Sequence, residues 1–144
     1  MNPAEENKYK QIRWRQRFEN YTKAFLLLQR TTQIKNPSEA EQGGMIQFFE
    51  VAFELAWKTL KDYLESRGMI AAYPRDVLKK AYQTGILDNG QRWLEALEDR
   101  NRTTHIDDEE MTRIIVERIR NDYYPLLRQL YDDLKKEAGK ESHE

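Results

Sequence analysis

The sequence predicts an all-α protein, and more narrowly an up-and-down antiparallel four-helix bundle with one or two additional short helices. The first observation is that apolar residues return at spacings of three and four in three long stretches, the period of an amphipathic helix. The second is that the alternating apolar and polar runs of β-strands are nearly absent. A chain of 144 residues suits one modest core, so residues 1–144 are expected to form a single domain.

The first long helix is expected from about residue 8 to about residue 33. It ends before Pro37, because a proline disfavours helical geometry at the residue that precedes it. Ser38 and Glu41 then have the spacing of a capping box, which begins a second helix. The apolar stripe of the first helix consists of Trp14, Phe18, Tyr21, Phe25 and Leu28.

The second helix is the clearest element, and it continues to Gly68, a natural C-terminal cap. Its apolar positions cover so broad a face that we expect other helices on more than one side of it. Gly43 and Gly44 lower helix propensity near its start and indicate either a kink or a later beginning. The broad face consists of Met45, Phe48, Phe49, Ala52, Phe53, Leu55, Ala56, Trp57, Leu60 and Leu64.

Two short helices are expected between the second and the last long helix. Residues 74–84 have a proline in the first turn, and Gly85 directly after them suits a helix stop. Residues 88–102 begin at an Asp-Asn-Gly turn and carry Trp93 and Leu97 among their apolar positions.

The last long helix is expected to begin near Asp107 or Asp108, whose carboxylates suit a helix N-terminus. The same run of carboxylates at residues 107–110 resembles a metal site, but the helix start explains it without a metal, and none is expected. Pro125 lies inside this helix and should bend it. Residues from about 135 to 144 are polar and are expected to fray.

Composition narrows the classes of function. The chain has 24 basic and 25 acidic residues, so a broadly basic nucleic-acid footprint is absent and any RNA contact has to be local. It has no cysteine, which excludes disulfides and thiolate metal sites and suits the cytoplasm. No segment approaches the ~20 apolar residues of a membrane span, so no membrane contact is expected.

The stretch "EDRNRTTHIDDEE" at residues 98–110 places Arg100 and His105 at the end of one helix and just before the next. On an uninterrupted helix these two side chains would point about 140° apart. The β-branched residues between them, and the acidic helix start that follows, indicate an interruption. His105 would then lie at a helix junction, where its ring can turn back toward Arg100.

An arginine beside a histidine suits phosphate chemistry. The Arg100 guanidinium can hold phosphate oxygens, and the His105 imidazole can take a proton from a ribose 2′-hydroxyl or give one to a leaving 5′-oxygen, without a metal. The alternative is a polar junction in which His105 caps helix ends and bonds Asp107 or a threonine, and spacing alone favours this alternative. Because such cleavage works best with both a base and an acid, the enzyme hypothesis requires a homodimer that brings two histidines to one cleft.

The segments "GMIQFFEVAFELAWKTLKDYL" and "WLEALEDRNRTTH" together resemble the HEPN superfamily of small helical proteins. More narrowly, they resemble its branch of nucleotidyltransferase substrate-binding proteins. The similarity extends from about residue 14 to residue 134, and its most specific part is the Arg-Asn-x-x-x-His motif at residues 100–105 combined with the pattern of the second helix.

This resemblance implies a homodimeric four-helix bundle that is made together with a small nucleotidyltransferase subunit. Some members are toxins whose Arg-x4-6-His motif cleaves RNA at the dimer cleft. Carried over, Arg100 and His105 are the catalytic residues, and Asn101 and Arg102 are substrate-binding. One branch has a tyrosine two residues after the histidine that the partner adenylylates; Asp107 stands there, so that form of silencing is not expected.

The leading interpretation is therefore a partner subunit of a small nucleotidyltransferase that acts as a toxin-like, metal-independent endoribonuclease, with RNA as a possible ligand and no cofactor. The alternative is a non-catalytic substrate-binding or partner subunit, and a third possibility is a helical dimer with an interaction role only. The chain is not expected to be a nucleotidyltransferase itself, because it has no glycine-rich phosphate loop and no strand with paired aspartates.

The tryptophans Trp14, Trp57 and Trp93 could stack on a base, but packing in the core or at a dimer interface is the better expectation for each. Arg13 and Arg17, four residues apart in the first helix, could touch RNA phosphates, but a solvated face is favoured.

Overall fold

The computed structural model describes residues 2–141, and within this range every regular element is a helix, which confirms the all-α prediction. Short turns connect the helices, and within residues 2–141 none of the helices is long and apolar enough to cross a membrane. The α-helices are α1 (Pro3–Thr32), α2 (Glu39–Ser66), α3 (Pro74–Gln83), α4 (Gly90–Arg102), α5 (Glu109–Arg118) and α6 (Tyr124–Glu141). A 3₁₀ turn, Thr103–His105, follows α4, and a π-helix, Ile119–Tyr123, joins α5 to α6.

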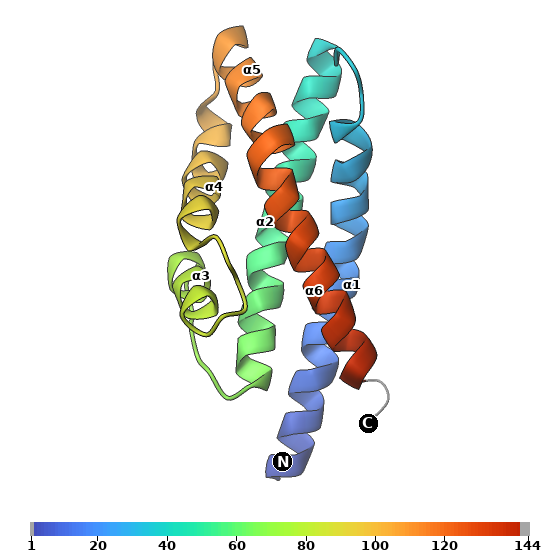
Figure 1. Ribbon diagram of the computed structural model, residues 1–144, viewed down its shortest axis with the longest axis vertical. Coiled ribbons are helices and arrows are strands. Elements are labelled where there is room, and N and C mark those ends of the chain that lie inside the picture. Colours follow the sequence, from blue (N-terminus) through green and yellow to red (C-terminus); the bar gives the residue numbers. More distant parts are fainter. Residues whose placement is uncertain (1, 142–144) are drawn as a thin grey trace.

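The long helices lie along the long axis of an elongated molecule (Figure 1). α1 and α2 run antiparallel beside each other and form the most extensive helix–helix contact. α5 and α6 follow one another as a second long column, in which α5 contacts α2 and α6 contacts α1. The short helices α3 and α4 lie one above the other on the other side of α2, so α2 is covered on several sides, as its broad apolar face predicts.

Local capping explains where the first two helices begin. The Asn2 side chain accepts a hydrogen bond from the Glu5 N–H at 2.9 Å, and α1 therefore starts at residue 3 rather than near residue 8. Its first turns are polar, so the apolar period could not reveal them. The capping box of α2 is confirmed: the Glu41 N–H donates to Ser38 Oγ at 3.1 Å, and the Ser38 N–H donates to Glu41 Oε1 at 2.9 Å. Gly43 and Gly44 lie inside α2, so the later beginning is wrong.

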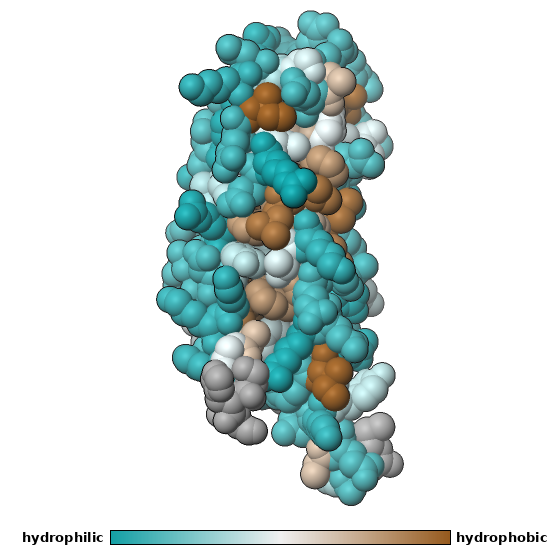
Figure 2. Space-filling model, turned by 90° about the vertical axis from the view of Figure 1, so that its right-hand side faces the viewer, coloured by the Kyte–Doolittle hydropathy of each residue, from teal (hydrophilic) through white to brown (hydrophobic). Residues whose placement is uncertain are grey.

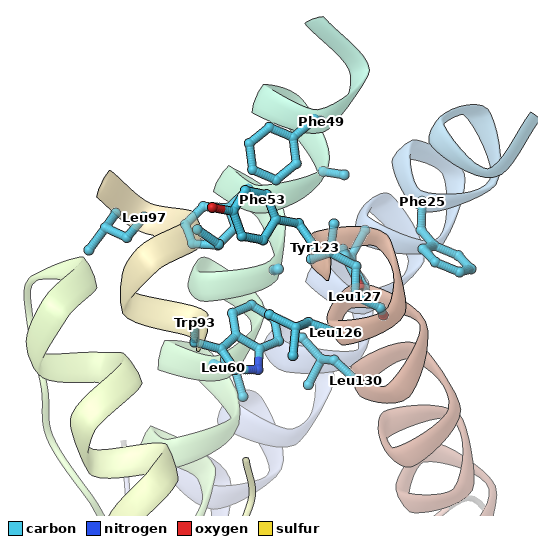
Figure 3. Packing of buried hydrophobic residues seen from close by; sticks show 14 of the residues in the cluster. Phe25, Phe49, Phe53, Leu60, Trp93, Leu97, Tyr123, Leu126, Leu127 and Leu130 are labelled. Atoms are coloured by element: carbon cyan, nitrogen blue, oxygen red, sulfur yellow. Dashed lines mark hydrogen bonds between the residues drawn. The ribbon is translucent and has the colours of Figure 1, made fainter. Parts of the chain in front are cut away.

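Aromatic side chains from four elements form the centre of the core. Phe49 and Phe53 of α2 face Tyr123 and Trp93, with ring centroids 5.6 Å apart for Phe49–Tyr123 and 5.8 Å apart for Phe53–Trp93 (Figure 3). Trp14 is fully buried against Tyr63, so both buried tryptophans serve packing, as expected. Burial of each such side chain stabilises the folded state by about 1.5–3 kcal/mol or more. The contact between Phe53 and Trp93 therefore holds α4 against α2.

The disturbance expected at Pro125 takes the form of the π-helix just before it. A proline cannot donate to the carbonyl four residues earlier, and its ring clashes there; the wider π turn accommodates both effects. α6 then continues to Glu141, so the segment expected to fray from about residue 135 is helical that far, and His143 lies outside the described residues.

A buried carboxylate joins α1 to α2. Asp62 is 2% exposed, and its Oδ2 lies 3.0 Å from Arg17 Nε, while its Oδ1 lies 3.8 Å from Arg13 Nε. Arg13 is exposed, as the expected solvated face requires, whereas Arg17 is half-buried against Asp62, so that expectation is wrong for Arg17. Sequence periodicity could not reveal the pair, because its members are 45 residues apart.

Candidate functional site

The predicted interruption between Arg100 and His105 is present. Arg100 lies in the last turn of α4, and His105 ends the 3₁₀ turn that follows. Ile106 is extended, and the next helix starts after Asp108, whose side chain accepts from the Met111 N–H at 2.7 Å. Asp108, not Asp107, is therefore the N-cap of α5.

The Arg100 side chain leans over α2 and lines a shallow hollow of about 680 Å³. Its Nε lies 3.9 Å from Glu54 Oε2. The two groups form an ion pair at this distance, which is too long for a hydrogen bond. The Nε atom is buried and has no hydrogen-bond partner among residues 2–141, although the side chain as a whole is 26% exposed. An unsatisfied buried donor costs about 1–3 kcal/mol, so an acceptor that reached it would be favoured. The hollow is lined by Gln47, Glu50, Val51, Glu54, Leu55 and Arg100.

His105 is exposed to solvent and lies outside the hollow that Arg100 lines. In the described part of the chain its imidazole forms no hydrogen bond or ion pair, and the bond to Asp107 or a threonine that the alternative interpretation required is not made. Thr103 instead donates its hydroxyl to the Arg100 carbonyl at 2.7 Å, which closes the end of α4. The imidazole is therefore free to meet a ligand or a second chain.

The two predicted substrate-binding residues also face outward. Asn101 is exposed. Arg102 is exposed as well, and its Nη1 lies 3.8 Å from Asp99 Oδ1. The four residues of the predicted site are thus contiguous at the end of α4, but within one chain only Arg100 lines the hollow over α2.

Asp99 is an important residue that the sequence analysis missed. Its side chain is almost fully buried, and both carboxylate oxygens accept from Arg118 Nη1, at 3.1 and 3.2 Å. The Tyr123 hydroxyl donates a third hydrogen bond to it. Burial, followed by this bond to the Asp99 carboxylate, raises the pKa of Tyr123 well above its usual value. No pattern in the sequence singled out Asp99, because its partners Arg118 and Tyr123 are 19 and 24 residues away.

This cluster positions the candidate site. Asp99 anchors the last turn of α4 to α5 and the π-helix, and the neighbouring residue, Arg100, is thereby directed to α2 on the other side. The carboxylates of residues 107–110 lie at the exposed start of α5. Within residues 2–141, no three histidine, aspartate or glutamate side chains gather closely enough to hold a metal ion.

The described residues thus form an all-helical domain with an arginine and a histidine at a helix junction. The family described as nucleotidyltransferase substrate binding protein like matches residues 16–136, and the chain belongs to this HEPN-related family. A crystal structure of a protein from Thermus thermophilus is similar, with 33% sequence identity and a TM-score of 0.74. The match covers 79% of this chain and 98% of that chain. No curated protein matched the sequence.

Proposed function

We propose that this chain is the partner subunit of a small nucleotidyltransferase, which it assists through binding rather than by transferring nucleotides itself. The observation that carries the proposal is the family match over residues 16–136, because the family is described by substrate binding for a nucleotidyltransferase. The helical architecture supports it, since residues 2–141 include no strand on which the paired aspartates of a transferase could stand. The absence of cysteine suits a cytoplasmic location for such a pair.

We further propose that the chain is an up-and-down four-helix bundle, with α3 and α4 sharing the fourth position, and that it works as a homodimer. Support comes from the outer face of α2, where Phe48, Val51 and Leu55 follow one another at spacings of three and four and Val51 is 47% exposed. Leu26 and Leu27 of α1 are also exposed, and Figure 2 shows apolar side chains gathered in the upper half of the side of the molecule that includes α1.

Co-expression tests the partner role. A tagged chain is co-expressed with a small nucleotidyltransferase of the same organism, and both proteins are expected to elute together after a wash at moderate salt. Light scattering of the chain alone is expected to give twice the mass of one copy, and Val51→Asp to reduce it to one copy. A monomeric parent would contradict the dimer, and separate elution would contradict the partner role.

A second candidate function, metal-independent endoribonuclease activity, is favoured by the unsatisfied Nε–H of Arg100 together with the exposed imidazole of His105. In this reaction Arg100 holds the scissile phosphate and one His105 takes the proton of the 2′-hydroxyl, whose oxygen attacks phosphorus. The His105 of the second copy gives a proton to the leaving 5′-oxygen. The products are a 2′,3′-cyclic phosphate and a 5′-hydroxyl.

The test incubates the purified chain with RNA in the presence of a chelator, beside His105→Ala. Cleavage by the parent alone, with 2′,3′-cyclic phosphate ends, is expected if the chain is a ribonuclease. No cleavage by the folded, dimeric parent would contradict the ribonuclease activity and leave the non-catalytic partner role.

A further inference from the structure

Glu54 is the most connected carboxylate of the hollow over α2. Its Oε2 accepts a hydrogen bond from Trp57 Nε1 at 3.0 Å, and its Oε1 lies 3.4 Å from Lys58 Nζ. Both partners belong to the same helix, so the position of Glu54 is fixed without any contribution from Arg100. The carboxylate is a fixed negative charge against which the guanidinium of α4 can be oriented.

Arg100, in contrast, depends on Glu54. Among residues 2–141, Glu54 is its only ion-pair partner, and the 3.9 Å separation leaves the buried Nε–H without a hydrogen bond. The contact thus orients the guanidinium by charge but does not use its donor. Once Arg100 turns away from Glu54, a phosphate oxygen in the hollow can accept from that donor. An oxyanion accepts such a hydrogen bond more strongly than a neutral group does.

The charges of the hollow oppose such a phosphate. Its lining has two carboxylates, Glu50 and Glu54, against the single guanidinium of Arg100, with no lysine or histidine among the lining residues. A phosphate therefore has to compete with Glu54 for Arg100. Glu50 has the same charge in the same hollow but no ion pair within the described chain, which makes it a matched control.

We propose that Glu54 is a positioning residue whose carboxylate is the displaceable counter-ion of Arg100: it holds the guanidinium over the hollow and yields it to the phosphate group of an RNA or a nucleotide. This inference rests on the second proposed function only in taking Arg100 as the phosphate-binding residue. The contact between Glu54 and Arg100 sets the affinity for the phosphate and requires no cleavage. Binding and cleavage are therefore tested separately.

The experiment measures binding of hexauridylate and of UMP to the full chain by calorimetry at low salt. Glu54→Gln keeps an oxygen that can accept from Trp57 and removes the charge that faces Arg100. We expect it to raise the affinity for the preferred probe about three- to five-fold, the upper part of the range for a partly exposed pair, and Glu50→Gln to change it less than two-fold. In an Arg100→Ala background the gain from Glu54→Gln is expected to vanish.

The two probes distinguish the sources of the phosphate: a gain confined to hexauridylate assigns the site to phosphodiesters, and a gain with UMP assigns it to a terminal phosphate. Nitrogen-15 spectra supply a direct signature. The Arg100 Nε–H resonance, assigned by its loss in Arg100→Lys, is expected to move in Glu54→Gln but not in Glu50→Gln.

Equal gains in affinity from Glu54→Gln and Glu50→Gln, or a gain that persists without Arg100, would show that Glu54 acts only as a general negative charge. Either result would overturn the inference. A loss of affinity in Glu54→Gln, or no binding by the folded parent and variants, would overturn it as well. Binding with the expected pattern but without RNA cleavage would uphold the inference while removing the ribonuclease.

Discussion

Replacing Asp99 with alanine is expected to loosen the end of α4 where the candidate site lies. In the wild-type chain Asp99 is 3% exposed, and its carboxylate accepts from Arg118 and from the Tyr123 hydroxyl. After the substitution Arg118, whose side chain is 46% exposed, can turn to water. The Tyr123 hydroxyl cannot, because the tyrosine is buried against Phe49.

The magnitude follows from these two fates. A buried hydroxyl left without an acceptor costs about 1–3 kcal/mol, and loss of the half-exposed ion pair adds roughly 0.5–1 kcal/mol after screening by solvent. The expected destabilisation of Asp99→Ala is therefore about 1.5–4 kcal/mol. Tyr123→Phe alone removes the hydroxyl and leaves Asp99 paired with Arg118, so it is expected to cost only about 0.5–1.5 kcal/mol.

The assay is urea unfolding followed by circular dichroism, with the free energy of unfolding extrapolated to water. The double variant that combines Asp99→Ala with Tyr123→Phe leaves no buried hydroxyl without an acceptor. The destabilisation of this double variant is therefore expected to be smaller than the sum of the two single effects by about 1 kcal/mol or more. Additive single effects, or a cost of Asp99→Ala below about 0.5 kcal/mol, would refute the role given to this cluster.

Three further outcomes are expected from the same unfolding assay. Asp62→Asn weakens the pairing with Arg17 between α1 and α2 and is expected to cost about 1–2 kcal/mol; an unchanged urea midpoint would contradict that pairing. Asp108→Ala removes the N-cap of α5 and is expected to cost about 1 kcal/mol, whereas Asp107→Ala, its neighbouring control, should cost much less. Burial raises the pKa of Tyr21 and Tyr123, so the unfolded state ionises first and stability is expected to fall as pH rises above about 10, by up to about 1.4 kcal/mol per pH unit for each tyrosine. Stability that stays flat from pH 9 to 11 would contradict that burial.

Features set by neighbouring residues could be predicted from the sequence. The capping box of Ser38 and Glu41 is local, and so is the N-cap at the start of the last helical column, which was narrowed to Asp107 or Asp108. The helix interruption between Arg100 and His105 could also be inferred, because β-branched and acidic residues act within a few positions.

Features set by packing between distant segments could not be predicted. Glu54 and Arg100 are far apart in sequence, and no periodicity links them. The motif at residues 100–105 therefore indicated Arg100 but not the Glu54 carboxylate beside it. Asp99 looked like an ordinary charged position, although Arg118 and Tyr123 surround it. The π-helix before Pro125 likewise depends on how the chain accommodates that ring within a packed column.

Sedimentation of the chain mixed with a small nucleotidyltransferase of the same organism tests the partner role most directly. The proposed function predicts one faster-sedimenting species that contains both chains in a fixed ratio at micromolar concentrations. Two species that sediment at their separate rates, with each protein folded, would contradict it.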